Sequence, residues 1–396
     1  MDIIAMMPNS SRVPKKYLLT GGTGFLGTFL AKGLLEKGAH LYFLVRQKSG
    51  RDSRFYVQAQ LKRVGLQSQF FSQVHIVSGD TTKQNCGIDR EWFINHHSDI
   101  NAIWHIAGLV DFNNRERLFL INTEGMRHII ELAKNLRAHI YYVSTAYAVG
   151  ASRKRELFED ALKHSGTFRN SYEESKYEGE RLLATQIASG DITATIFRPS
   201  ILVGHSETGV TLSYTGYYVP LFFFATLRQQ HPFITGLPFI IPYVRNATLN
   251  LIPIDHSVRL ILALAVLPES NGKIFHIVHP QPPTVRYIFQ ESLAELGYRR
   301  IYFVPVPSWI LHGINKVIRI FSYLFVRYGK RVRTQLSDYV AYLTDTRSFS
   351  TKNVRRLLGV AADVPPLNKT LLQRYIMYAV GHHFGRTKYH NLSFVL

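Results

Sequence analysis

Six short apolar runs between residues 17 and 199 constrain the fold of this chain most. Each run has apolar side chains at consecutive positions, so both of its faces can be buried, as they are in a parallel sheet. The longer segments between the runs, such as residues 25–38 and 123–136, carry apolar residues at helical spacing. Repeated strand–helix–strand units predict a doubly wound parallel α/β sheet. The predicted strands are residues 17–20, 41–45, 74–79, 102–108, 140–145 and 194–199.

Three glycines, Gly21, Gly24 and Gly27, follow the first predicted strand and open the first predicted helix. In this context the first glycine permits a tight turn, the second lets the backbone approach a pyrophosphate, and the third lets the helix lie against the strand. The N-terminus of the helix adds unpaired N–H groups and a favourable dipole for phosphate. This loop predicts a dinucleotide site on a Rossmann-type fold.

The residue after the second predicted strand is Arg46, and no acidic residue occurs before Asp52. A carboxylate at this point would bind the ribose hydroxyls of NAD, whereas a guanidinium group can pair with a 2′-phosphate. Lys48 or Arg51 can support Arg46 in that role. The loop therefore favours NADPH over NADH, although a basic loop is also ordinary in a basic protein.

The stretch RNSYEESKYEGERLL, residues 169–183, holds Tyr172 and Lys176 one helical turn apart on the same face. This spacing alone does not separate a catalytic pair from two solvated side chains. Thr145 ends the fifth predicted strand, 27 residues before Tyr172, which favours the catalytic interpretation. We expect the remaining charged side chains of this helix to be solvated: Glu173, Glu174, Glu178 and Glu180.

The second half of the chain is richer in aromatic and basic residues. Residues 214–244 are dense in Tyr, Phe, Pro and Gly and predict an apolar substrate wall or lid, since the stretch is too interrupted for a membrane span. Residues 308–336 predict a long helix, either a core helix with a solvated face or a basic amphipathic surface touching anionic lipid. From residue 281 onward there are 17 basic and 5 acidic side chains, which favours an anionic partner. No nucleic-acid module of the usual kinds occurs, so we expect no nucleic-acid partner.

Composition limits the remaining classes. A single cysteine, Cys86, excludes an internal disulfide framework and a Cys-based zinc site. The 17 histidines contain no H-x-x-x-H set, so we expect no metal site. The opening residues do not match a secretory signal, which predicts a cytoplasmic protein, with peripheral membrane contact as a variant. The oligomeric state stays open.

Several motifs together resemble one family. They are TGGTGFLG (20–27), LVR (44–46), VSTAYAVG (143–150), SYEESKYEGERLL (171–183), IFRPSILVG (196–204) and NLIPIDHSVRLI (250–261). Over roughly residues 16–285 the chain is similar to extended short-chain dehydrogenases/reductases of the thioester-reductase and fatty acyl-CoA reductase branch, called male-sterility-type reductases. Residues 343–359 resemble the segment that follows the substrate region in fatty acyl reductases, where a short helix containing Asn follows a strand.

The resemblance implies roles for individual residues. Thr145, Tyr172 and Lys176 correspond to the catalytic hydroxyl, the proton donor and its supporting cation. Asn122 matches an Asn that props the lysine through water, although a helix N-cap explains it equally well. Asp80 would hold the adenine edge, and Gly108 would lie under the cofactor. The residues implied to bind the cofactor are Gly21, Thr23, Gly24, Phe25, Leu26, Gly27, Arg46, Asp80, Ala107, Lys176 and Pro199.

The implied reaction is NADPH-dependent reduction of an acyl thioester, on coenzyme A or an acyl-carrier protein, to an aldehyde and in some members further to an alcohol. The alternatives are a hydroxysteroid- or ketoacyl-type dehydrogenase and a nucleotide-sugar epimerase or dehydratase. We expect an N-terminal tail (1–15), an NADP-binding domain (16–205) and a smaller substrate-binding region (206–396) that returns strands and helices to the core and ends in the basic part.

Overall fold

A computed structural model describes residues 15–47, 52–110, 114–152, 154–162, 167–311, 339 and 341–385. Its main feature is a seven-stranded sheet in which every neighbouring pair is parallel. The order across the sheet is β11-β7-β5-β4-β1-β2-β3. The strands are β1 (Lys16–Thr20), β2 (His40–Val45), β3 (Val74–Ser78), β4 (Ala102–His105), β5 (His139–Val143), β7 (Ala194–Pro199) and β11 (Ile274–Ile277). All six predicted strands are confirmed, and β11 is an addition that the sequence analysis missed.

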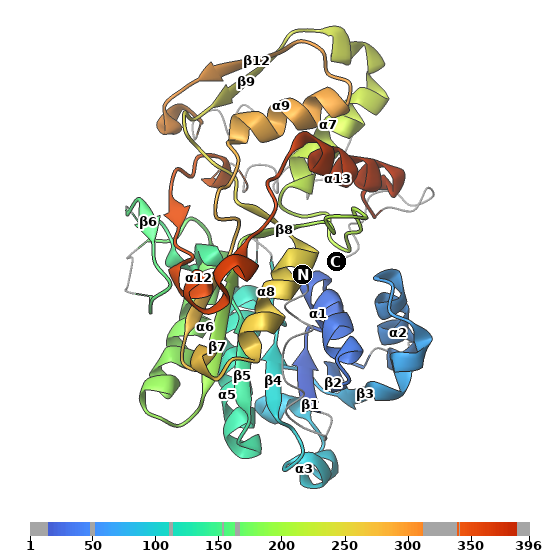
Figure 1. Cartoon of the computed structure of the whole chain (residues 1–396), viewed down its shortest axis with the longest axis vertical. Coiled ribbons are helices and arrows are strands. Elements are labelled where there is room, and N and C mark those ends of the chain that lie inside the picture. Colours follow the sequence, from blue (N-terminus) through green and yellow to red (C-terminus); the bar gives the residue numbers. More distant parts are fainter. Residues whose placement is uncertain are drawn as a thin grey trace.

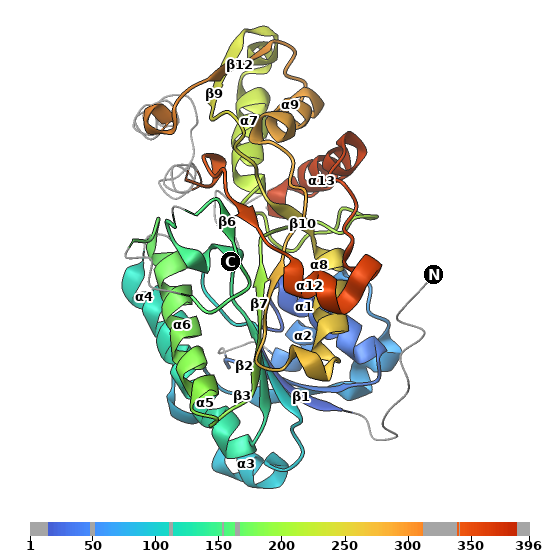
Figure 2. The same cartoon turned by 60° about the vertical axis from the view of Figure 1, so that its left-hand side comes forward.

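Helices cover both faces of this sheet (Figure 2). One face packs on α1 (Phe25–Glu36), α2 (Ser53–Arg63), α8 (Ile254–Ala265) and α12 (Lys352–Leu358), around a core that includes Phe43, Trp104 and Phe197. The other face packs on α3 (Arg90–His96), α5 (Gly125–Leu136) and α6 (Ser171–Ala188). A short helix, α4 (Arg115–Phe119), continues through the π-helical turn η4 (Leu120–Glu124) into α5. The doubly wound sheet is confirmed, and its order reverses between β1 and β4, where ligands bind in such folds.

A second group of elements lies beyond the carboxyl ends of the strands, at the top of Figure 1. We call it the upper lobe: α7 (Tyr218–Gln230), β9 (Phe239–Tyr243), α9 (Val285–Glu295), β12 (Ile301–Pro305) and α13 (Lys369–Gly381). It has its own core, which includes Tyr217, Leu249 and Phe289. The parallel pair β8 (Ile201–Val203) and β10 (Leu251–Pro253) connects it to the sheet half. The predicted aromatic segment, residues 214–244, forms α7 and β9 of this lobe.

The chain then returns to the sheet half. The strand β13 (Ser348–Phe349) pairs in parallel with β6 (Glu156–Leu157), and α12 follows it, which confirms the predicted strand and short helix within residues 343–359. The division predicted at residue 205 stays a prediction, because β11, α8 and α12 lie after it and still pack with the sheet. The remaining short 3₁₀ turns are residues 68–73, 84–87, 146–149, 232–236, 268–270, 359–362 and 383–385.

The long helix predicted at residues 308–336 lies largely outside the described residues. Within the described part of the chain, no helix is both long and apolar enough to span a bilayer.

Candidate active site

The glycine loop between β1 and α1 is as tight as the sequence predicts. Gly21 has a φ of +70°, and a Cβ atom there would lie 2.4 Å from the backbone nitrogen of Ala107. A Cβ at Gly27 would lie 2.1 Å from the carbonyl oxygen of Gly21. Gly24 caps α1 without a side-chain hydrogen bond to the first turn. The first N–H groups of α1 therefore stay available to an anion, as a pyrophosphate site requires.

The other predicted loop residues flank these glycines. Thr23 and Phe25 are half-buried, and Leu26 is buried in the core below α1. Thr28, which the sequence analysis did not select, donates its hydroxyl to the carbonyl oxygen of Gly24 at 2.7 Å and to that of Gly22 at 3.2 Å. Thr28 therefore stabilises the glycine loop by hydrogen bonds to two of the loop's carbonyl groups.

At the end of β2 no carboxylate faces the site among the described residues. Arg46 is exposed directly after the strand, while Lys48 and Arg51 lie outside the described residues. Asp52 is used as the N-cap of α2, where it accepts hydrogen bonds from the backbone nitrogens of Arg54 and Phe55. Asp80 follows β3 and accepts two hydrogen bonds from Thr82, both 2.9 Å long.

The carboxyl ends of β1 and β4 are joined by buried polar contacts. Thr20 Oγ1 lies 2.8 Å from His105 Nδ1, and the backbone nitrogen of Ala107 donates to Thr20 Oγ1 at 3.3 Å. Burial lowers the pKa of His105 to about 3, with a smaller contribution from the charge of Lys176. His105 is thus neutral and fixes the loop that leads to Ala107 and Gly108. The sequence analysis missed it, although it stands at the end of a buried strand.

The three predicted catalytic residues converge beyond β5. Thr145 begins the turn η5 (Ala146–Val149) and its side chain hydrogen-bonds Tyr172. Burial raises the pKa of Tyr172 above its usual value, and the hydrogen bond with Thr145 lowers it. Lys176 lies one turn along α6 and donates to the carbonyl oxygen of Val143 at 3.1 Å. Two hydroxyl groups and one amine therefore share a site at the carboxyl edge of the sheet, where Thr145 and Lys176 are buried and Tyr172 is half-buried.

Lys176 is enclosed by the sheet half. Its Nζ lies 5.0 Å from the ring centre of Tyr142, and a Cβ at Gly108 would lie 2.9 Å from it. Burial lowers the pKa of Lys176 to about 8, while the charge of Glu180 raises it. The amine stays largely protonated at neutral pH because that pKa is still above 7.

Asn122 is not the helix N-cap that the sequence left open, because it lies inside the continuous helical segment from α4 to α5. Its side-chain nitrogen donates to Ser175 Oγ at 2.9 Å and to the carbonyl oxygen of Leu109 at 3.1 Å. Its side-chain oxygen accepts from the backbone nitrogen of Leu109 at 2.8 Å. Asn122 therefore ties the loop after β4 to α6, next to Lys176.

Two of the four glutamates predicted to be solvated are buried. Glu173 has no exposed surface and pairs with Arg169, and Glu180 is 2% exposed and pairs with Arg198, which has no exposed surface. The expectation holds better for Glu174 and Glu178, whose side chains are 30% and 28% exposed. Glu173 and Glu180 lie seven positions apart, on a face of α6 that meets Arg169 and the buried Arg198 of β7, whereas Glu174 and Glu178 lie on another face.

Arg169 links the start of α6 to residues 342–347. Its guanidinium group lies 4.7 Å from the ring centre of Tyr342 and 5.2 Å from that of Tyr147. It donates to Glu173 at 2.8 Å and to Asp345 at 2.9 Å, and Arg347 also binds Asp345. Sequence patterns offered no signal for this network, because Arg169 and Asp345 are 176 positions apart.

The upper lobe contains a pocket of about 700 Å³. Its lining is almost entirely apolar and comes from α7, β9, α9 and residues near 342; it includes Phe223, Phe224, Phe239, Ile241, Leu249, Phe289 and Phe303. Tyr339 and Tyr342 line it too, and Tyr342 accepts a hydrogen bond of 3.0 Å from Asn170, the N-cap of α6. Tyr342 also packs edge-on against Tyr147, which follows Thr145 by two residues, with 4.8 Å between the ring centres. One end of the apolar pocket therefore lies beside the predicted catalytic residues.

The fold, the glycine loop and the Thr–Tyr–Lys arrangement define an extended short-chain dehydrogenase/reductase. More narrowly, the chain belongs to the male sterility protein family of NAD(P)-dependent reductases, whose model matches residues 19–261. That membership indicates a nicotinamide cofactor.

Individual relatives agree with this family. Over 382 residues the chain is 28% identical to the non-canonical nonribosomal peptide synthetase FrzA of Cladobotryum sp., covering 91% of this chain and 36% of that protein. It is 29% identical over 235 residues to the fatty acyl-CoA reductase wat of Drosophila melanogaster, covering 50% of this chain and 44% of that protein. The chain thus spans less than half the length of these relatives.

Among solved structures, the terminal R domain from the myxalamid PKS-NRPS biosynthetic pathway superposes with a TM-score of 0.79 at 25% identity. The superposition covers 95% of this chain and 93% of that domain. The upper lobe is therefore within the shared architecture, together with the sheet.

Proposed function

We propose that this chain uses NADPH to reduce an acyl thioester with a hydrophobic acyl group, releasing an aldehyde that it can reduce further to an alcohol. The observation that carries the proposal is the apolar pocket, whose lining residue Tyr342 accepts a hydrogen bond from Asn170, two residues before Tyr172. A hydrophobic chain would fill such a pocket while its carbonyl group meets the hydroxyl donors. The resemblance to peptide-synthetase reductase domains and a fatty acyl-CoA reductase supports the same reaction class.

The cofactor site suits NADPH. The Gly21 and Gly27 cradle has no room for a Cβ, and the first turn of α1 has free N–H groups for a pyrophosphate. Arg46 would pair with the 2′-phosphate, Asp80 would meet the adenine, and Ala107, Lys176 and Pro199 would flank the nicotinamide side. When bound there, NADPH supplies a hydride.

The residues of the chain then act on the substrate oxygen. Negative charge develops on the thioester carbonyl oxygen as its carbon is reduced, and the hydroxyl groups of Thr145 and Tyr172 stabilise that charge by hydrogen bonding. Tyr172 gives its proton to the oxygen, which leaves a hemithioacetal. The nearby Lys176 ammonium favours the resulting phenolate. Cleavage of the carbon–sulfur bond then returns the hydroxyl proton to the Tyr172 phenolate and yields an aldehyde and a thiolate, which takes a proton from water to become the thiol.

The lining of the pocket argues against a nucleotide-sugar substrate, because sugar hydroxyl and phosphate groups need polar partners that these side chains lack. The thioester carrier, coenzyme A or an acyl-carrier protein, has its charged part outside the apolar pocket. The basic surface of the protein is complementary to either carrier.

The test is NADPH oxidation, followed by absorbance, with long-chain acyl-CoA, an acyl-carrier protein, a ketosteroid and a UDP-sugar as separate substrates, and with NADH replacing NADPH. We expect thioester-dependent turnover that Tyr172→Phe lowers by about 10²–10⁴-fold. Tyr177→Phe, on the same helix outside the site, is the matched control. Turnover of the sugar or steroid without thioester turnover would refute the substrate class, and an unchanged rate in Tyr172→Phe would refute the mechanism.

A further inference from the structure

Large apolar side chains gather on the outer surface of the upper lobe. Fifteen such side chains are exposed among the described residues, and six of them lie in two short stretches, residues 233–240 and 302–309. Phe233, Ile240 and Trp309 are 70%, 66% and 73% exposed. We call the six the lobe tip: Phe233, Leu237, Ile240, Tyr302, Val304 and Trp309. Such clustering in a soluble domain marks an interaction surface.

The strand pair β9 and β12 explains how this surface forms. Ile240 is the register partner of Tyr302, so the two side chains share one face of the pair. Val304 lies two residues further along β12 on that same face, while Phe303 between them lines the pocket. The strand alternation thus gives this pair an apolar face on each side, one inside the pocket and one in solvent.

The pocket opens on the same surface. Phe233, Leu237 and Ile240 line the pocket and are also exposed, so they form its mouth. The far end of a chain that fills the pocket would reach this mouth and stay in contact with apolar side chains there.

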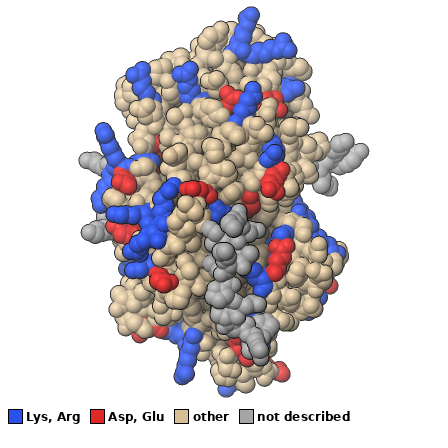
Figure 3. All heavy atoms as spheres, viewed as in Figure 1, with Lys and Arg blue, Asp and Glu red and all other residues tan. Residues whose placement is uncertain are grey.

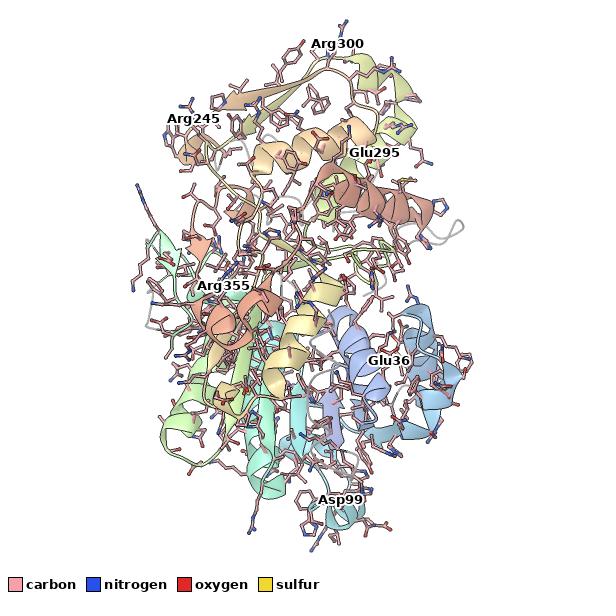
Figure 4. The ribbon with its side chains drawn as sticks, viewed as in Figure 1. Glu36, Asp99, Arg245, Glu295, Arg300 and Arg355 are labelled. Atoms are coloured by element: carbon pink, nitrogen blue, oxygen red, sulfur yellow. The ribbon has the colours of Figure 1, made fainter. Side chains whose placement is uncertain are left out.

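Charge around the lobe tip has one sign. Residues 228–249 and 296–311 contain Arg228, Arg245, Arg299 and Arg300, all exposed, and no Asp or Glu. In Figure 4, Arg300 lies at the upper end of the molecule and Arg245 at the side of the lobe, while Glu295 lies lower, on α9. Figure 3 shows the same separation, with basic side chains on the rim of this end.

We propose that the lobe tip docks on an anionic lipid bilayer. Exposed apolar residues surrounded by arginine, with Trp and Tyr at the surface, match a membrane interface, where apolar groups insert and the guanidinium groups meet lipid phosphates. An acidic protein would be complementary to the arginines alone and would leave the apolar side chains of the tip unexplained. The inference concerns a surface outside the catalytic residues and goes beyond the proposed reaction: the far end of a long acyl chain, whose carbonyl group lies at the catalytic end of the pocket, can extend from the mouth into the bilayer without meeting water.

The test is binding of the full chain to phosphatidylcholine vesicles with and without phosphatidylglycerol at about 30% of the lipid, a fraction at which basic surfaces bind anionic membranes. Binding is measured by co-sedimentation and by Trp309 fluorescence. We expect binding to the anionic vesicles and a blue shift that Trp309→Phe abolishes, since Trp104 is buried and Trp92 lies on α3, at the end of the molecule opposite the lobe tip (Figure 1). The double variant Tyr302→Glu/Val304→Glu, which leaves the pocket lining intact, should lose about tenfold or more of its affinity. Arg245→Gln/Arg300→Gln should lose about 30-fold, the equivalent of roughly 1 kcal/mol for each charge.

Val360→Glu is the matched control, because Val360 is 79% exposed and lies outside the lobe tip; its vesicle binding should equal that of the native chain. Absence of vesicle binding, or equal losses in the control, would overturn the proposal. A native dimer that the Tyr302→Glu/Val304→Glu variant converts to a monomer would also overturn it, because the lobe tip would then be a dimer interface. So would a change in Trp309 fluorescence that an acyl-carrier protein causes and anionic vesicles do not. NADPH oxidation with a short, soluble thioester, run on the same samples, reports separately on the proposed reaction.

Discussion

The catalytic edge of the sheet and the pocket of the upper lobe are built from opposite kinds of side chain. At the carboxyl edge of the sheet, buried polar groups are held by one another: Thr20 with His105, Asn122 with Ser175, and Thr145 with Tyr172. In the upper lobe, the pocket is lined by Phe, Ile, Leu and Pro with few polar atoms. Polar contacts fix direction and distance, whereas apolar contacts mainly fix volume. The sheet half is therefore suited to one chemistry, and the lobe to a range of hydrophobic chains.

The ion pairs of α6 test how strongly the sheet half depends on its buried polar contacts. Glu180→Gln leaves the Arg198 guanidinium buried without its carboxylate, so we expect the free energy of unfolding to fall by about 3–5 kcal/mol, measured by urea denaturation. The matched variant is Glu174→Gln on the same helix, where the partner Arg115 is 61% exposed and the expected change is about 0–1 kcal/mol. Equal effects in the two variants would show that burial of the pair carries no special weight.

The pocket should respond to volume alone. Leu249→Phe adds bulk to a lining position that is 4% exposed, so we expect kcat/KM for the longest accepted acyl chain to fall by about 10–200-fold, with little change for a short chain. Met377→Phe, on the exposed face of α13, is the control for size. A uniform loss over all chain lengths would instead indicate a disturbed fold.

The smallest expected effect is the pH dependence of the free energy of unfolding that His105 contributes in the sheet half. The pKa of His105 is about 3 in the folded chain against about 6.5 in an unfolded one, so the unfolded state binds a proton first as the pH falls below 6.5. The contribution of neutral His105 to the free energy of unfolding is therefore fully present well above pH 6.5 and falls on acidification, by about 1.4 kcal/mol at pH 5.5. Urea denaturation at pH 7.5 and 5.5 should show that this part of the loss is missing in His105→Asn. An equal loss in both proteins would contradict the assignment.

The local pattern of the sequence predicted most of the sheet half. Its strands are buried on both faces, so their apolar runs stand out, and the glycine loop has a steric requirement that only glycine meets at Gly21 and Gly27. The strand β11 was missed because it follows the aromatic segment and joins the sheet after a long excursion, so that its partner β7 is distant in sequence.

The fine structure of the site depended on distant pairs. The burial of Glu173 and Glu180 follows from Arg169, Asp345 and Arg198, and no helical periodicity reveals which polar face of α6 those residues cover. The local alternative for Asn122, a helix N-cap, was wrong, because its side chain binds Leu109 and Ser175 outside its own helix. Tertiary packing decided each of these positions.

The return of the chain from the upper lobe has a consequence for synthesis on the ribosome. Asp345 and Tyr342 brace Arg169 and Asn170 at the start of α6, and Asn353 binds Glu159 across 194 positions. The nucleotide loop at residues 20–27 can fold with partners that precede α6, whereas the helix that carries Tyr172 and Lys176 needs residues made about 170 positions after it. A nascent chain therefore acquires its catalytic geometry only after residues 342–353 have left the ribosome.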